Sequence, residues 1–466
     1  MLESIGRFII DAADILGGYP LFFLLIGGGL YLFIRSGAVS LRRLPDAIRE
    51  LRRKQSGNDS TGQISSVQAL ASVIAATVGV GNIAGVAIAL VMGGPGAIFW
   101  MWVSALVGMS TKFHEGTLAI MYKGKDDQGR PQGGPMHIIE QGLGRRWTLL
   151  GKFFAVAGMF GTLAIMNSNQ LTEAFMATFV NHDWLQANET VSTIGSWLSL
   201  DNVQTFRMLF GMAVAVIVGV VVLGGIKRIA HVATILVPFM VCLYFVMVLA
   251  IIITHIEGVP AVFRSIFAEA FNLRAGFGAL AGIALIGARR AALVNDAGIG
   301  TASIMHGASN NDKPVREGLI AMLGPGIDSG LVCTLSAVAI LLCGDLNVEG
   351  VKGLEVAMGA FRNALPYGDI LLMCVVICFA LSSMFSFSFY GSTCASYLFG
   401  SRSSRWYTWF FILSLVVFAV IPLEAVVGIC DLSYALMAIP TMIALLALSP
   451  KVRCAARQYF DKNNKK

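Results

Sequence analysis

Eleven apolar segments dominate this chain, and each is close to the length that a helix needs to cross a lipid bilayer. A transmembrane helix requires roughly 20 mainly apolar residues. The segments lie at about 16–34, 65–92, 95–121, 147–179, 206–224, 229–254, 262–290, 315–343, 367–399, 406–421 and 424–449. Of 466 residues, 56% are hydrophobic and 13% charged, whereas a soluble domain carries about 25% charged residues. We therefore expect an all-α polytopic membrane protein with about 11 transmembrane helices.

Lys and Arg residues are concentrated in alternate connections between these segments. They follow the first, third, fifth, seventh and ninth segments and fill the tail after the eleventh, whereas residues 181–204 contain none. Because Lys and Arg are enriched in cytoplasmic loops, we predict an outer N-terminus and an inner C-terminus in a bacterial-type cytoplasmic (inner) membrane. The net charge of +7 arises in these loops, so the lipid bilayer, and not nucleic acid, is the expected partner. The sequence leaves the oligomeric state open.

A glycine-rich stretch lies inside the second apolar segment. Gly79-Val80-Gly81-Asn82-Ile83-Ala84 satisfies the G-x-G-x-x-G/A pattern, but that pattern indicates a dinucleotide only between a strand and a helix, with an acid about 20 positions on. Here the flanking residues are apolar, and the position about 20 residues on falls in Phe-Trp-Met-Trp, which contains no acid. Two glycines and an Asn weaken a helix, and exposed backbone near mid-bilayer is tolerated where it lines a cavity. The stretch predicts a broken membrane helix; a tightly packed continuous helix is the alternative.

A second glycine pair predicts a matching break. Gly276-Phe277-Gly278 lies about a dozen residues before Arg289-Arg290, which should mark the cytoplasmic end of the seventh segment. Paired breaks in two halves are typical of inverted repeats. We expect inverted five-helix repeats at 61–258 and 259–450, an extra helix and basic loop at 1–60, and a basic tail at 451–466. Asn295 to Gly300 should then belong to the inner loop, outside the pocket.

Breaks at mid-bilayer present helix N-termini with partial positive charge and unwound carbonyls with partial negative charge. These groups suit the carboxylate of a zwitterionic amino acid and a nearby Na⁺. The residues therefore favour a secondary transporter. No H-E-x-x-H or G-x-S-x-G motif occurs and the eight cysteines have no paired spacing, so we expect neither an enzyme nor an organic cofactor. A channel is disfavoured because two opposed breaks suit alternating access better than a continuous pore.

Several stretches carry a resemblance to a known family. They are "ATVGVGNIAGVA", "GGPGAIFWMWVSALVGM", "GGPMHIIEQGLG", "GGIKRIAHVATILVPFM", "NDAGIGTASIMHG" and "PVREGLIAMLG". From about residue 65 to about residue 400 the chain resembles the alanine/glycine:cation symporter (sodium:alanine symporter) family. The resemblance implies a leucine-transporter-like fold, Na⁺-coupled symport by alternating access and small neutral amino acids as substrates. Proton-coupled symport on the same fold is the alternative.

The chain departs from the family pattern where substrate is expected. Val80 replaces the usual Thr between the glycines, Asn167 and Asn169 stand where a Gln is usual, and Asp296 replaces a Glu. In the ninth segment Phe387 stands at the position of the usual Trp. Because Gln to Asn and Trp to Phe both remove volume, we expect a roomier pocket and a neutral substrate larger than alanine.

These arguments define a predicted site. The expected substrate-binding residues are Thr77, Gly79, Val80, Gly81, Asn82, Asn167, Gly276, Phe277, Gly278 and Phe387. The resemblance also implies a Na⁺ site, in which the hydroxyls of Ser382 and Ser383 join backbone carbonyls near Ala75 and Val78. Thus Na⁺ is the expected co-transported ion, and the amino acid is the expected ligand.

Some of these residues have two possible roles. Asn82 and Asn167 either contact substrate or backbone, or form interhelical hydrogen bonds without a ligand. Phe277 either gates the ligand or packs between helices. Each serine either binds Na⁺ or bonds its own helix backbone, as serines in helices commonly do.

Ionisable residues inside the apolar segments also have two possible roles. Asp328 lies in the eighth segment, where an acid is by default a functional hypothesis; it either couples ion movement or holds helices together. His114, Glu115 and Glu173 either form a proton relay or pair helices at the interface.

Overall fold

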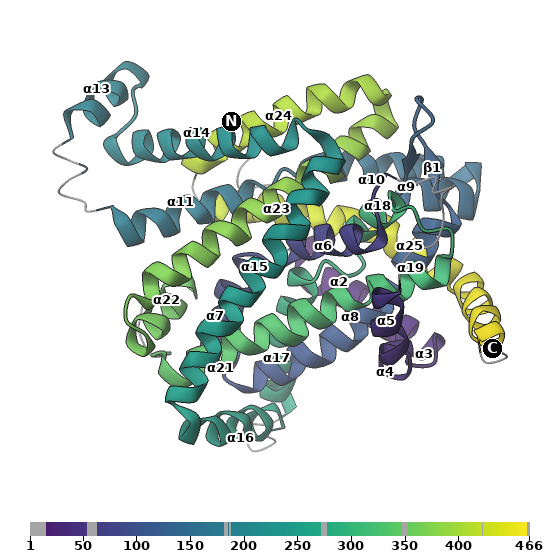
Figure 1. Cartoon of the computed structure of the whole chain (residues 1–466), viewed down its shortest axis with the longest axis horizontal. Helices are drawn as coiled ribbons and strands as arrows, with labels where there is room; N and C mark the ends of the chain where they lie inside the picture. Colours follow the sequence, from purple (N-terminus) through teal and green to yellow (C-terminus); the bar gives the residue numbers. More distant parts are fainter. Residues whose placement is uncertain are drawn as a thin grey trace.

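Helices form almost all of the described chain, because backbone inside a bilayer must satisfy its own hydrogen bonds. The structure is a computed structural model, and it describes residues 15–53, 63–180, 185, 188–271, 277–346, 353–421 and 423–463. Figure 1 shows long helices packed together, with shorter helices at the edges. Strands β1 (Gly124–Lys125) and β2 (Pro131–Gln132) form a short antiparallel pair, in which Gly124 lies opposite Gln132.

Most of the long helices coincide with the expected apolar segments, and shorter helices lie in the connections. In the first half the α-helices are α2 (Tyr19–Phe22), α3 (Gly28–Arg35), α4 (Val39–Arg42), α5 (Leu44–Arg52), α6 (Ser66–Thr77), α7 (Gly81–Gly93), α8 (Gly96–Met121), α9 (Pro135–Ile138), α10 (Thr148–Gly161), α11 (Ile165–Phe179), α13 (Glu189–Leu198) and α14 (Asn202–Val222). In the second half they are α15 (Gly225–Thr254), α16 (Val259–Ala270), α17 (Phe277–Val294), α18 (Thr301–Gly307), α19 (Pro314–Ala321), α20 (Leu323–Pro325), α21 (Cys333–Cys343), α22 (Gly353–Ala364), α23 (Gly368–Phe399), α24 (Ser401–Val420) and α25 (Leu423–Asn463). Short π- or 3₁₀-helical segments are η1 (Phe23–Gly27), η2 (Ile139–Leu143), η3 (Arg145–Trp147), η4 (Ile256–Gly258) and η6 (Gly326–Val332).

Within the described residues, eight helical segments are long and apolar enough to cross a membrane, and one bent pair of helices adds a ninth. The eight are Ile15–Arg35, Arg145–Phe179, Asn202–Val222, Gly225–Thr254, Pro314–Cys343, Gly368–Phe399, Ser401–Val420 and Val426–Asp461, and the bent pair is α6 with α7. They correspond to all of the expected segments except 95–121 and 262–290. The first of these is nonetheless a single long helix, α8.

Small residues let α8 approach its neighbours closely. A Cβ at Gly116 would lie 2.6 Å from Cβ of Ala321 in α19, and a Cβ at Gly318 would collide with the Thr117 hydroxyl. Glycine at such positions allows membrane helices to pack backbone to backbone. As a result α8, which also packs against α17 and α18, is buried along most of its length.

The expected segment 262–290 is divided differently from the prediction. α16 is a separate helix with exposed aromatic residues such as Phe267, and α17 continues through Arg290 for another turn, to Val294. The arginine pair therefore does not mark the end of a helix. A described interruption follows α17, at Asn295–Gly300.

Candidate functional site

The second apolar segment is divided into two helices. α6 ends at Thr77, α7 begins at Gly81, and the two helices meet at 46°. Val78 has extended backbone angles (φ −72°, ψ 97°), which stop the helical hydrogen-bond ladder. The N–H groups of Val80 and Gly81 and the carbonyl oxygens of residues 76–78 make no hydrogen bond with another described residue. The break that the glycines predict is present, and it exposes both donors and acceptors.

A cavity of about 370 Å³ lies beside this break. Most of the lining is apolar, with a few polar groups, as in most small-molecule sites. It is lined by Ala76, Thr77, Gly79, Gly81, Ala84, Gly85, Ile88, Met92, Gly161, Ala164, Met166, Asn167, Gln170, Ile286, Arg290, Val294, Asp296, Ser383, Phe387, Val427, Cys430, Asp431 and Tyr434.

Five of the predicted substrate-binding residues line this cavity. They are Thr77, Gly79, Gly81, Asn167 and Phe387. The Asn167 amide is half-buried and makes no hydrogen bond with another described residue, so its donors and acceptor are available to a ligand. A Cβ at Gly79 would lie 3.2 Å from the Ser383 hydroxyl and 3.8 Å from Oδ1 of Asn167.

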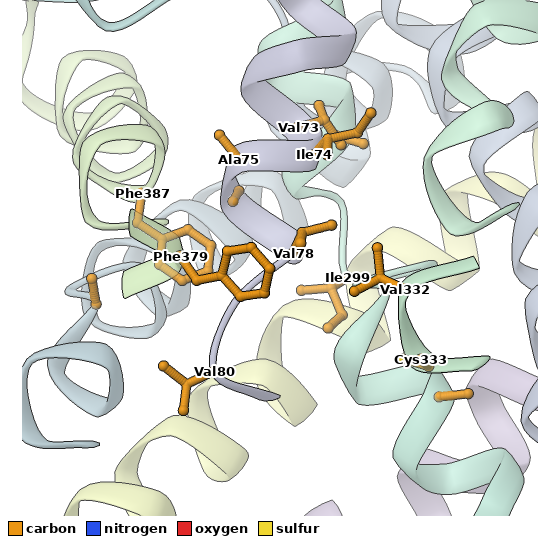
Figure 2. Packing of buried hydrophobic residues seen from close by; sticks show 14 of the residues in the cluster. Val73, Ile74, Ala75, Val78, Val80, Ile299, Val332, Cys333, Phe379 and Phe387 are labelled. Atoms are coloured by element: carbon orange, nitrogen blue, oxygen red, sulfur yellow. The ribbon is translucent and has the colours of Figure 1, made fainter. Parts of the chain in front are cut away.

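Val80 and Asn82 lie outside the lining. Val80 is buried in the hydrophobic core. Figure 2 shows the neighbouring Val78 between Phe379 of α23 and Ile299. At Asn82, Oδ1 accepts a hydrogen bond from the Gly79 N–H at 2.9 Å, and Nδ2 donates to Oδ1 of Asp328 in η6. The amide thus makes both the backbone contact and the interhelical hydrogen bond that the sequence left as alternatives.

The remaining predicted residues fall at the start of α17. Gly276 lies outside the described residues, and Phe277 and Gly278 form the first turn of the helix. A further interruption, within the described residues, lies at Asn295–Gly300, between α17 and α18. It has left-handed φ angles at Asp296 (50°), Gly298 (90°) and Gly300 (100°).

The expectation that Asn295–Gly300 lies outside the pocket is wrong, because Asp296 lines the cavity. The error arose from treating Arg289 and Arg290 as an interface marker, whereas Arg290 itself lines the cavity. Asn295 and Asp296 are both buried, and the Asn295 side chain accepts a hydrogen bond from the Ala297 N–H at 3.0 Å. The sequence signal for this interruption was a run of Asn, Asp and two glycines within six residues.

Three of the predicted Na⁺-site groups converge. The hydroxyls of Ser382 and Ser383 donate to the Ala75 carbonyl at 3.2 and 3.1 Å. Phe379 O of the same helix is a second acceptor, at 2.9 and 3.0 Å, and it shares the single proton of each hydroxyl with Ala75 O. The serines therefore join α23 to the last turn of α6, three residues before Val78.

Buried ionisable residues of α8 lie next to the second interruption. Lys112 is fully buried, and its ammonium group makes no hydrogen bond or ion pair with another described residue. Glu115 accepts a hydrogen bond from the Gly298 N–H at 2.6 Å. This bond links α8 to the segment between α17 and α18. Sequence reasoning missed Lys112, although a Lys inside the apolar segment 95–121 was the same kind of signal that singled out His114 and Glu115.

The other proposed relay residues are not brought together. Glu173 pairs with Arg207 of α14 at 2.7 Å, which is the helix-pairing role. His114 Nδ1 donates to Ser110 O of its own helix at 2.8 Å. Sequence reasoning also missed the cavity residues Gln170 and Asp431, which come from different helices.

The sequence of this chain is similar to those of known transporters. The model of the sodium:alanine symporter family matches residues 2–466. The sodium/alanine symporter AgcS of Methanococcus maripaludis is 37% identical over 432 residues, which cover 91% of each chain. The protein named probable sodium/glutamine symporter GlnT of Bacillus subtilis is 32% identical over 463 residues, covering 98% of this chain and 91% of that protein.

A solved structure gives the fold independently. MhsT in complex with L-phenylalanine superposes with a TM-score of 0.56 at 12% identity, covering 84% of this chain and 98% of that one. The fold is therefore leucine-transporter-like, in a multi-pass protein of the inner membrane. The family match supports a secondary amino-acid symporter. The chain belongs to the sodium:alanine symporter family.

Proposed function

We propose that this protein couples the inward movement of Na⁺ to the uptake of a small neutral amino acid by alternating access. The observation that carries the proposal is the position of Ser383. Its hydroxyl lines the cavity and also bonds the Ala75 carbonyl at the helix break. An ion held at this serine lies next to a substrate in the cavity, so each stabilises the binding of the other.

The substrate carboxylate binds the N–H group of Gly81, which lines the cavity. This group lies at the N-terminus of α7, where the helix dipole attracts negative charge. Gly79 and Gly81 have no side chain to cover the backbone on the cavity side. Asp296 brings a carboxyl group to the same cavity, whose oxygens can accept hydrogen bonds from the ammonium group of the zwitterion.

Na⁺, the co-transported ion, binds the carbonyl oxygens of Ala75 and Val78 and the hydroxyls of Ser382 and Ser383. A hydroxyl oxygen carries two lone pairs in addition to its proton, so a serine that donates to Phe379 O still has acceptor capacity for a cation. Unwound carbonyls are the usual cation ligands in transporters with broken helices. The freed Val78 carbonyl fits that role.

The size of the cavity supports a substrate larger than alanine. Its volume of about 370 Å³ falls in the range of roughly 300–1,000 Å³ typical of pockets for drug-sized ligands. Asn167 and Phe387, the smaller replacements, both line it.

Uptake of labelled alanine and glutamine into proteoliposomes tests the proposal. An imposed inward Na⁺ gradient, with a protonophore present, should drive accumulation of at least one of them. Accumulation that needs a proton gradient and survives replacement of Na⁺ by choline would instead assign proton coupling on the same fold. Equilibration without accumulation under either gradient would contradict symport.

A further inference from the structure

A second hollow, of about 500 Å³, lies between the N-terminal helices and the C-terminal helix, away from the amino-acid cavity. Five arginines line it: Arg35 at the end of α3, Arg42 of α4, Arg43, and Arg453 and Arg457 on α25. Figure 1 shows α3 and α4 close to the C-terminal end of the chain. Arg453 and Arg457 are one helical turn apart, so both reach the same hollow.

Most of this positive charge is not balanced within the described chain. Arg43 pairs with Asp46 at 3.1 Å and lies 4.0 Å above the ring of Phe460. The other four arginines form no ion pair and no side-chain hydrogen bond with another described residue. Like charges gathered in one hollow repel one another, so an anion that accepts their N–H donors would stabilise the arrangement.

The surroundings indicate which anion. The transmembrane segment Ile15–Arg35 ends at the hollow, which therefore lies where the bilayer meets water. On the same helix Leu30, Tyr31 and Ile34 are 46%, 46% and 69% exposed. This apolar surface leads directly to the arginines, so acyl chains can lie along α3 while a charged headgroup enters the hollow.

We propose that this arginine hollow binds the phosphate of an anionic phospholipid. Guanidinium groups bind phosphate through paired hydrogen bonds, and basic pockets between membrane helices recognise anionic headgroups. A bound lipid would join the extra N-terminal helix to α25, across elements far apart in the sequence. The proposal does not depend on which amino acid or ion the protein carries.

Native mass spectrometry of the purified full-length protein tests this site. Dioleoylphosphatidylglycerol, dioleoylphosphatidylcholine and inorganic phosphate are titrated separately against the wild type and the variant Arg42→Gln/Arg457→Gln. We expect the wild type to prefer phosphatidylglycerol over phosphatidylcholine. The double variant should bind phosphatidylglycerol about 30-fold more weakly, at roughly fivefold per arginine, with no change for phosphatidylcholine.

The matched control is Arg402→Gln/Arg405→Gln, which removes the same charge from exposed positions of α24 outside the hollow. Equal losses in both double variants, or no loss in Arg42→Gln/Arg457→Gln, would overturn the proposal. Displacement of the lipid by an equal concentration of inorganic phosphate would assign a free-anion site instead. If the double variant does not elute as a folded protein, Arg457→Gln alone should show the fivefold loss.

Discussion

At the scale of single residues, Gly79 is closely confined beside the cavity. A methyl group there would approach the Ser383 hydroxyl to 3.2 Å and Oδ1 of Asn167 to 3.8 Å. We expect Gly79→Ala to lower the initial rate of Na⁺-driven uptake by about tenfold, because it intrudes between an ion-site residue and a substrate-site residue and overpacking costs about 1–3 kcal/mol. Initial rates in proteoliposomes, normalised to reconstituted protein, measure the effect.

Gly359→Ala in α22 is the matched control for that experiment. A Cβ at Gly359 would meet nothing within 4 Å, and this glycine does not line the cavity. Uptake by this variant should stay near the wild-type rate. Equal losses in the two variants would contradict the specific role of the space around Gly79.

Ser382 and Ser383 lead to a prediction about the ion. Replacing either serine with Ala removes one oxygen from the proposed Na⁺ site but keeps the helix intact. We expect the Na⁺ concentration for half-maximal uptake to rise about tenfold, since a contact to a charged group is worth roughly 1.5–3 kcal/mol. Amino-acid uptake as a function of Na⁺ concentration measures this.

Ser388→Ala serves as the control for the serine variants, because its hydroxyl donates to Phe385 O of its own helix at 2.7 Å and makes no hydrogen bond with α6 in the described structure. Its Na⁺ dependence should match that of the wild type. A Na⁺ dependence unchanged in both Ser382→Ala and Ser383→Ala would place the ion elsewhere.

At the scale of helices, the Asn82–Asp328 hydrogen bond fixes the break between α6 and α7 to η6. Asn82→Ala removes the acceptor for the Gly79 N–H and leaves the buried Asp328 without its amide donor. We expect the unfolding free energy to fall by about 3 kcal/mol, since an unsatisfied buried polar group costs about 1–3 kcal/mol, and more if charged. Thermal or denaturant unfolding in detergent measures the loss.

A double-mutant cycle tests whether that loss belongs to the pair. Asn82→Ala leaves the Asp328 carboxyl without its hydrogen-bond donor, and Asp328→Ala removes that carboxyl. The stability lost by the double variant should therefore be smaller than the sum of the losses of the two single variants. Strict additivity would mean that the two residues act independently.

The two breaks show what a sequence can predict about such helices. The first was predictable, because Gly-Val-Gly-Asn inside a long apolar run weakens a helix wherever it packs. The break predicted at Gly276 falls on residues outside the described chain, and the interruption at Asn295–Gly300 was assigned to a loop because a pair of arginines normally indicates the water interface. Here Arg290 lines an internal cavity, and only the tertiary arrangement distinguishes an interfacial arginine from an internal one.

The residues that line the cavity were also only partly predictable from the sequence. Thr77, Gly79 and Gly81 share one local motif and were predictable together. Asp431 and Tyr434 come from α25, more than 300 positions away, and no periodicity places them opposite a glycine motif. Asn167 and Phe387 were predicted only from the family resemblance. A family pattern marks residues that are far apart in the sequence but close together in the folded protein.

At the scale of the whole molecule, substrate choice follows from the volume and chemistry of the cavity. We expect neutral amino acids larger than alanine to compete with labelled alanine for uptake, since Asn167 and Phe387 both leave extra room. Competition by all twenty amino acids at equal concentration measures the selectivity. Competition by glycine and alanine alone would contradict a roomier pocket.

Orientation in the membrane is the remaining whole-molecule prediction. The Lys and Arg distribution predicts that Ser196 in α13 faces outward and that Cys454 near the C-terminus faces the cytoplasm; both residues are exposed. In a background with the eight native cysteines replaced by serine, single-cysteine variants carry either Ser196→Cys or a restored Cys454. A membrane-impermeant maleimide should label the first in intact cells and the second after permeabilisation.

The opposite labelling pattern would invert the topology, and with it the placement of the arginine hollow. Arg453 and Arg457 are on the same helix as Cys454 and within one turn of it, so the hollow and this cysteine share one side of the membrane. Labelling of Cys454 in intact cells would put the hollow at the outer leaflet. Labelling after permeabilisation alone would put it at the cytoplasmic leaflet, where anionic lipids are attracted by the same Lys and Arg residues that orient the chain.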